Sequence, residues 1–102
     1  MEKIIAGNSI NVNEQGYLEN LSEWTMEIGH SIAHNEGIDM SDKHWEVISY
    51  LQEQHKNEVA LSIRKIGKSG IVSIKEFYDL FPNGPLKISS KIAGIPKPVS
   101  CI

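Results

Sequence analysis

The chain contains one cysteine in 102 residues, so no disulfide can form within it. A zinc site built from two or more cysteines of one chain is excluded for the same reason. A lone thiol is typical of a reducing compartment, and we therefore expect a cytoplasmic protein. No apolar run approaches the roughly 18–20 residues of a membrane-spanning helix. Residues 1–16 also lack the continuous apolar stretch of a signal peptide, so no membrane partner is expected.

Glycine-rich phosphate-binding motifs are missing as well. The sequence has no Walker A loop, no G-x-G-x-x-G and no nucleophile elbow. Aromatic residues are scarce, at 7%, and no aromatic ladder accompanies the lysines of the C-terminal half. The pI of about 5.8 is also low for a DNA-binding domain. These features disfavour direct binding of nucleic acid, and they imply no cofactor.

The composition is that of one small folded domain. Hydrophobic residues make up 40% and charged residues 23%, which is too apolar for a disordered chain. A chain of this length can bury a modest core. We expect one domain over residues 1–102, with a body over 1–93 and a flexible C-terminal arm over 94–102.

Charge is distributed unevenly along the chain. Residues 1–58 carry three basic and eleven acidic side chains, whereas residues 59–102 carry seven basic and two acidic ones. The net charges are therefore −8 and +5. Such a basic half can face an acidic partner, a nucleic acid or an anionic thiolate. Solvated surface on both halves explains the same numbers, and charge alone leaves the two readings open.

Alternation and turn residues predict a β-hairpin within residues 3–18, with its first turn at Gly7-Asn8. Apolar residues at helical spacing then predict five helices. They lie between residues 21 and 37, 41 and 56, 59 and 70, 73 and 82, and 85 and 94. The expected buried positions of the first, second and fourth helices are Leu21, Trp24, Thr25, Ile28 and Ile32, then His44, Val47, Ile48 and Leu51, and then Ile74, Phe77, Tyr78 and Phe81.

Helix boundaries are marked by capping residues. Ser73 and Glu76 form an S-x-x-E capping box, and Pro85 suits the first position of the last helix. Gly94 ends that helix, and Pro96 and Pro98 then favour an extended arm outside the core. The predicted fold is mainly α, a small winged-helix-like helical bundle with an N-terminal β-hairpin and an extended C-terminal arm.

Cys101 is the most informative residue, because it is next to last and lies beyond this arm. An exposed thiol there can act as a nucleophile, a sulfur carrier or a redox group. Lys97 should lower the pKa of the thiol, and the terminal carboxylate of Ile102 should raise it. An incidental surface cysteine explains the position equally well.

Histidines offer a weaker signal. His30 and His34 have the i, i+4 spacing that can hold a metal ion on a helix, but no third ligand is evident. We interpret both as structural or incidental, and His44 as part of the core. No metal site is therefore predicted.

The C-terminal third resembles a known family. The resemblance is carried by Leu80 to Pro85, by Lys91-Ile92-Ala93-Gly94-Ile95-Pro96-Lys97-Pro98, and by Cys101. This ending is similar to the arm of the DsrC/TusE family of sulfur-relay proteins, also described as gamma subunits of dissimilatory sulfite reductase. Two upstream segments agree with the family, namely Gly16 to Leu18, and Asn35 to Ile38 leading to His44 to Ile48.

The resemblance implies a helical, winged-helix-like body and a mobile arm whose cysteine carries persulfide sulfur. By this resemblance Cys101 would take that role, and we expect the chain to act as a sulfurtransferase subunit. Gly94 would be the hinge, and Pro96 and Pro98 would limit the conformations of the arm. The basic residues implicated in anion support or docking are Lys97, Lys91 and Arg64.

Two departures from the family pattern bear on the partners. Ser90 stands where members that work with sulfite reductase have a second cysteine, so the chain is more similar to the TusE type. That type implies a TusBCD-like sulfur donor and a tRNA thiouridylase as acceptor. Residues 56–73 also look shorter than the family's equivalent segment. Two alternatives stay open: a partner or modulator of sulfite reductase, and a non-catalytic winged-helix regulator in which Cys101 senses redox state.

Overall fold

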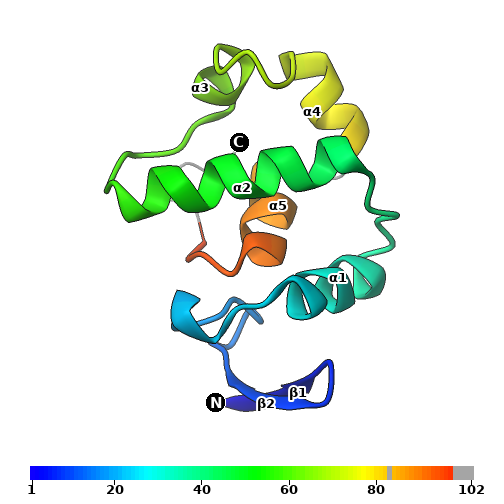
Figure 1. Cartoon of the computed structure of the whole chain (residues 1–102), viewed down its shortest axis with the longest axis vertical. Helices are drawn as coiled ribbons and strands as arrows, with labels where there is room; N and C mark the ends of the chain where they lie inside the picture. Colours follow the sequence, from blue (N-terminus) through cyan, green and yellow to red (C-terminus); the bar gives the residue numbers. More distant parts are fainter. Residues whose placement is uncertain (83, 98–102) are drawn as a thin grey trace.

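The computed structural model describes residues 1–82 and 84–97. A hairpin lies at one end of the molecule, two short helices lie at the other, and three longer helices fill the middle (Figure 1). In chain order the elements are β1 (Glu2–Ile5), β2 (Asn8–Asn11), the 3-10 turn η1 (Leu21–Glu23), α1 (Met26–Asn35), α2 (Asp42–Lys56), α3 (Ile63–Gly67), α4 (Ile74–Leu80) and α5 (Pro85–Ala93). The predicted mainly α fold with an N-terminal hairpin is confirmed, while the winged-helix likeness is not.

The hairpin turns one residue earlier than predicted. β1 and β2 pair antiparallel with Ile5 opposite Asn8, so the turn consists of Ala6 and Gly7. Both have positive φ angles, 51° and 79°, as a two-residue turn between twisted strands requires. Asn8 is already paired, and its side-chain amide donates to the carbonyl of Ala6 at 3.2 Å. The prediction placed Asn8 in the turn because glycine-asparagine is a common turn pair.

The first predicted helix is split in two. Residues 21–23 form η1, Trp24 is extended, and α1 begins only at Met26. Thr25 causes the break, since it is extended and its hydroxyl accepts a hydrogen bond from the amide of Ile28 at 3.3 Å. Trp24 still packs against the same core as Ile28, so the apolar spacing continues across the break and gave no sign of it.

His44 joins α2 to the end of α4. Its Nδ1 accepts from the backbone amide of Ser41 at 3.0 Å, so Nε2 carries the proton and donates to the carbonyl of Leu80 at 2.9 Å. The imidazole also meets the ring of Phe81 edge-on, with centroids 5.0 Å apart. The prediction of His44 as a core residue is confirmed, together with the buried face of α2.

The capping box at the start of α4 is confirmed, since Ser73 and Glu76 each accept from the other's backbone amide at 3.1 Å. Phe77 is fully buried, but Ile74 is 45% exposed and Tyr78 is 44% exposed. The prediction that Ile74 and Tyr78 are buried is therefore wrong. α4 lies at the edge of the molecule and reaches the core along a single stripe.

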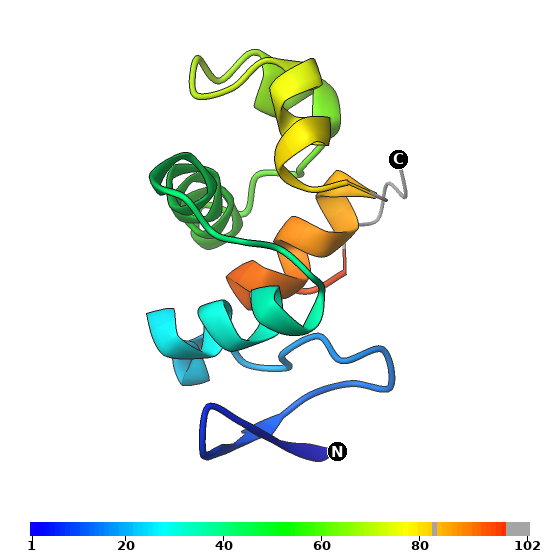
Figure 2. The same ribbon diagram turned by 90° about the vertical axis from the view of Figure 1, so that its right-hand side faces the viewer.

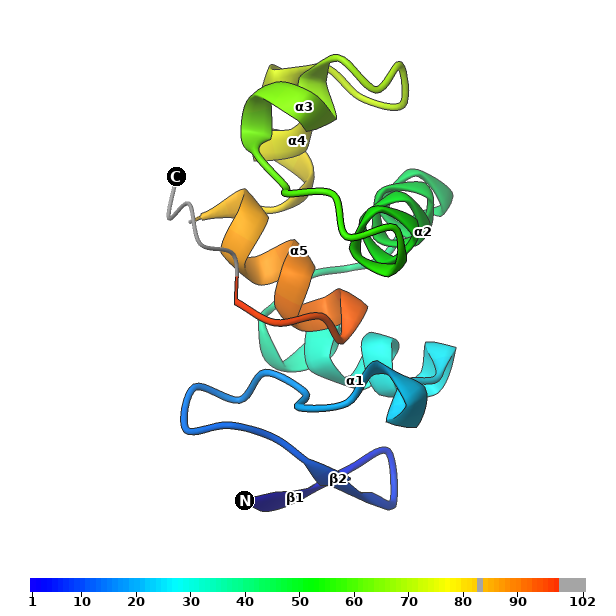
Figure 3. The same ribbon diagram turned by 90° about the vertical axis from the view of Figure 1, so that its left-hand side faces the viewer.

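α5 lies at the centre of the body, against both α1 and α2 (Figures 2 and 3). Pro85 takes its first position, as predicted. The buried residues of α5 are Pro85, Leu86, Ser89, Ser90, Ile92 and Ala93. No helix in the described ranges is both long and apolar enough to cross a membrane.

Candidate functional site

The arm begins at the C-terminal end of α5, where the helix is buried. Gly94 takes the left-handed conformation with φ 75°, and its amide donates to the carbonyl of Lys91 at 3.3 Å. The amide of Ile95 reaches the carbonyl of Ser90 at 3.2 Å, which completes a Schellman turn. Such a turn folds the residue after the glycine back onto its helix. Ile95 is accordingly 1% exposed and belongs to the core.

The arm was predicted to lie outside the core from Gly94 onward, and this is wrong for Gly94 and Ile95. Both are buried, whereas Pro96 is exposed and Lys97 is half-buried. The chain therefore leaves the core between Ile95 and Pro96. Pro98 and Cys101 lie outside the described residues. The hinge assigned to Gly94 stays a prediction.

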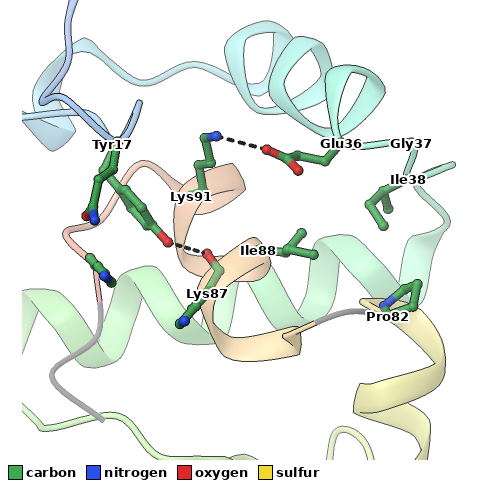
Figure 4. A pocket seen from close by; sticks show the side chains of 10 residues that line it. Tyr17, Glu36, Gly37, Ile38, Pro82, Lys87, Ile88 and Lys91 are labelled. Atoms are coloured by element: carbon green, nitrogen blue, oxygen red, sulfur yellow. Dashed lines mark hydrogen bonds and ion pairs between the residues drawn. The ribbon is translucent and has the colours of Figure 1, made fainter. Parts of the chain in front are cut away.

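A groove runs beside α5, close to where the arm emerges. It has a volume of about 530 Å³ and lies between the loop that carries Tyr17, the end of α1 and α5 (Figure 4). Its lining residues are Gln15, Tyr17, Glu36, Gly37, Ile38, Pro82, Lys87, Ile88, Lys91 and Lys97. We refer to it as the lysine groove, because three ammonium groups line it against one carboxylate.

Hydrogen bonds hold the walls of the lysine groove together. The ammonium of Lys91 pairs with Glu36 Oε1 at 2.8 Å, and the hydroxyl of Tyr17 donates to the backbone carbonyl of Lys87 at 3.1 Å (Figure 4). Among the described residues, the ammonium groups of Lys87 and Lys97 form no ion pair. The groove therefore keeps a net positive charge that can attract an anion.

The structure brings together only some of the predicted basic residues. Lys91 and Lys97 both line the lysine groove, but Arg64 is exposed on α3 and lines no part of it. Lys87 was not selected as a site residue from the sequence. Its spacing of four residues from Lys91 on a predicted helix was the signal that could have found it.

Ser90 is fully buried in α5, and its hydroxyl has no hydrogen-bond partner among the described residues. Its neighbour Ser89 is equally buried but donates to the carbonyl of Leu86 at 3.3 Å. An unpaired buried hydroxyl is destabilising. The hydroxyl of Ser90 therefore does not stabilise the core through a hydrogen bond within the described residues.

The two histidines of α1 have no metal-binding surroundings in the described part of the chain. His30 and His34 are both exposed, and the described residues contain no cluster of three or more potential ligands that could hold an ion. Cys101 lies outside the described residues.

Sequence comparison gives a consistent result. The family described as "DsrC like protein" matches residues 4–102. The sulfurtransferase TusE of Escherichia coli (strain K12) is 37% identical over 107 aligned positions, which cover 97% of this chain and 98% of that protein. The TusE of Salmonella typhimurium shows the same identity and coverage. Because 107 positions exceed the 102 residues of this chain, these relatives contain residues that it lacks. That the gap falls within residues 56–73 stays a prediction.

Solved structures agree over the whole chain. A chain in the crystal structure of dissimilatory sulfite reductase I superposes with a TM-score of 0.85 at 35% identity, and DsrC of Allochromatium vinosum with 0.82 at 32%. Each comparison covers 100% of both chains. The oxidized gamma subunit from Archaeoglobus fulgidus, also a DsrC, gives 0.81 at 31%. With the family match and full-length relatives in accord, the chain belongs to the DsrC-like family.

Proposed function

We propose that this protein is a sulfur-relay protein that carries persulfide sulfur on Cys101 and so acts as a sulfurtransferase. The observation that carries the proposal is the full-length identity of 37% to sulfurtransferases named TusE. The only cysteine of the chain stands next to last, six residues beyond Ile95, where the described chain leaves the core.

Sulfur enters by thiolate attack. The Cys101 thiolate attacks the outer sulfur of a donor persulfide, a new S–S bond forms at Cys101, and the S–S bond of the donor breaks. The donor cysteine leaves as a thiolate and takes up a proton. Neutral sulfur moves from one thiolate to another, so the step needs no external oxidant or reductant.

Sulfur leaves by the same chemistry in reverse. A cysteine thiolate of the acceptor attacks the outer sulfur of the Cys101 persulfide, and Cys101 departs as a thiolate. Since residue 90 is a serine, no second thiol of this chain can resolve the persulfide. The sulfur therefore has to pass to a partner protein.

The basic residues near the arm support an anionic cargo. Lys97 is four residues from Cys101, and it lines the lysine groove with Lys91 and Lys87. Nearby ammonium groups favour thiolate and persulfide anions over their protonated forms. Pro96 and Pro98 restrict the arm and reduce the entropy lost on docking. Arg64 is proposed to contact a partner from the separate surface of α3.

The partners follow from the single-cysteine arm. We propose a TusBCD-like complex as donor and a tRNA thiouridylase as acceptor, in the cytoplasm. A second candidate is association with sulfite reductase, which is favoured by the TM-score of 0.85 to a chain in a sulfite reductase crystal structure. Co-purification of the tagged protein with sulfite reductase would identify the second candidate.

The test is the intact mass of the protein after incubation with polysulfide, measured without reductant. Wild type should gain one sulfur atom that dithiothreitol removes, and Cys101→Ser should gain none. A matched control combines Cys101→Ser with Ser100→Cys, which moves the thiol by one residue. It distinguishes a requirement for a thiol at residue 101 from a requirement for any thiol on the arm. Loading of Cys101→Ser, or an unmodified wild type with a freely alkylated thiol, would contradict the proposal.

A further inference from the structure

The C-terminal end of α5 has no unsatisfied carbonyl. The last four carbonyls of a helix normally lack partners within it. In α5 the first two of these belong to the Schellman turn described above. The last two accept hydrogen bonds from side chains of other segments. The indole Nε1 of Trp24 donates to the carbonyl of Ile92 at 2.8 Å, and the amide Nε2 of Gln52 donates to the carbonyl of Ala93 at 2.8 Å.

These two donors come from different parts of the chain. Trp24 lies between η1 and α1, and Gln52 lies on α2. Neither is adjacent to the arm in sequence, since they are 68 and 41 residues away from the carbonyls they bind. The end of α5 is thus tied both to α2 and to the segment that precedes α1.

The Trp24 indole also fills the space that two glycines leave. A Cβ atom at Gly94 would lie 2.5 Å from Cδ1 of Trp24, and one at Gly29 would lie 2.8 Å from Cζ2. These separations are shorter than carbon atoms tolerate. Glycine at residue 94 is therefore required by the tryptophan as well as by its positive φ.

We propose that Trp24 and Gln52 are positioning residues for sulfur transfer, which hold the last turn of α5 so that the arm pivots after Ile95. The inference rests on the proposed function, because it concerns the delivery of Cys101. It assigns Gly94 to close packing rather than to the hinge that the sequence suggested. The tether that joins the held turn to Cys101 is then the six residues 96–101.

The length of this tether affects delivery. If the last turn opened, the tether would begin near residue 92 and have ten residues rather than six. The effective concentration of a tethered group falls with roughly the −3/2 power of tether length, which predicts a loss of about twofold. Helix ends open more readily as their contacts are removed, so the two side-chain hydrogen bonds add to the burial of Ile95 in keeping the tether short.

Two variants remove the hydrogen bonds, and Gln52→Met changes the shape less, because Trp24→Phe also removes the ring atom Cζ2 that lies beside Gly29. Trp24→Phe keeps an aromatic ring but no N–H, and Gln52→Met keeps the length of the side chain but no amide. Gln54→Met is the matched control, since it makes the same change on the same helix and its side chain forms no hydrogen bond among the described residues.

The measurement compares sulfur delivery with thiol access. Each protein is loaded with polysulfide, and kcat/KM is measured for transfer to the tRNA thiouridylase proposed above. Alkylation of Cys101 by iodoacetamide and hydrogen exchange at the amides of Gly94 and Ile95 are followed in parallel. We expect Gln52→Met, and Gln52→Met combined with Trp24→Phe, to show exchange at least tenfold faster and delivery lower by up to about twofold, with unchanged alkylation.

Each outcome decides the inference. Faster exchange with slower delivery in the variants, but not in Gln54→Met, supports a positioning role. Delivery equal to wild type despite faster exchange overturns it, as does an equal loss in Gln54→Met. If Trp24→Phe does not fold, Gln52→Met alone carries the test. Failure of wild type to load with polysulfide would instead contradict the proposed function.

Discussion

The two most different regions of this molecule are the arm root, residues 90–95, and the α3–α4 segment, residues 57–80. In the arm root every carbonyl at the helix end is paired and Ile95 is buried in the core. In the α3–α4 segment each helix contributes one buried residue of its own, Ile66 in α3 and Phe77 in α4.

This difference has a physical consequence for a relay protein. A thiol that has to reach a partner is best carried from a rigid base, because motion at the base would spread the thiol over a larger volume. The α3–α4 segment lies at the far end of the molecule from the hairpin (Figure 1).

The largest expected contrast comes from truncating one isoleucine in each region. Ile95→Ala should lower the free energy of unfolding by about 3–4 kcal/mol, because it removes buried methyl groups and leaves a cavity. Ile74→Ala, at a side chain that is 45% exposed, should cost about 1 kcal/mol or less. Urea unfolding measures both. If Ile95→Ala does not fold, Ile95→Val and Ile74→Val give the same comparison at smaller size. Equal losses at the two positions would remove the distinction between the regions.

A second contrast uses two glycines with similar backbone angles. Gly94 and Gly70 have φ angles of 75° and 85°, but a Cβ atom would meet Trp24 at Gly94 and nothing within 4 Å at Gly70. Gly70→Ala should cost about 1 kcal/mol from the left-handed backbone alone. Gly94→Ala should cost about 2–3 kcal/mol, because the clash with the indole adds to the same strain. Thermal unfolding followed by circular dichroism checks this, and equal costs would show that Trp24 moves aside freely.

The smallest expected effect lies within the arm root itself. Ser90→Ala should raise the free energy of unfolding by about 1 kcal/mol, since it removes a buried hydroxyl that has no partner among the described residues. Alanine also favours the helix. Ser89→Ala is the control and should lower stability by about 0.5–1 kcal/mol, because its hydroxyl donates to Leu86. Chemical denaturation distinguishes the two signs, and a loss in both would show that Ser90 makes a favourable polar contact.

Local sequence signals predicted most of the fold. The capping residue Ser73, the first helical residue Pro85 and the buried face of α2 were found where they were expected. Such features depend on residues within one turn of helix, so spacing alone reveals them. The errors came where local patterns are ambiguous, as at Thr25, whose hydroxyl caps α1, and at Ile74, whose apolar side chain has too little core to cover it.

For the candidate site, too, local features could be predicted and long-range contacts could not. The resemblance of the arm selected Cys101 and Lys97 from the sequence. The four-residue spacing of Lys87 and Lys91 could also have indicated two lysines on one side of a helix, and both line the lysine groove. Pairing of Lys91 with Glu36 joins residues that are 55 positions apart, so no local pattern contains it. The same holds for Trp24 and Gln52.

The sequence by itself determined most of the helices, the caps of α4 and α5, the single thiol near the end of the chain and the family. These properties arise from neighbouring residues or from motifs read along the chain. Only the tertiary structure decided that Ile95 is buried, that Gly94 lies under Trp24 and that side chains from two other elements complete the end of α5. The physical reason is that a helix end satisfies its carbonyls with whichever donors packing brings near, and packing joins residues that the sequence keeps far apart.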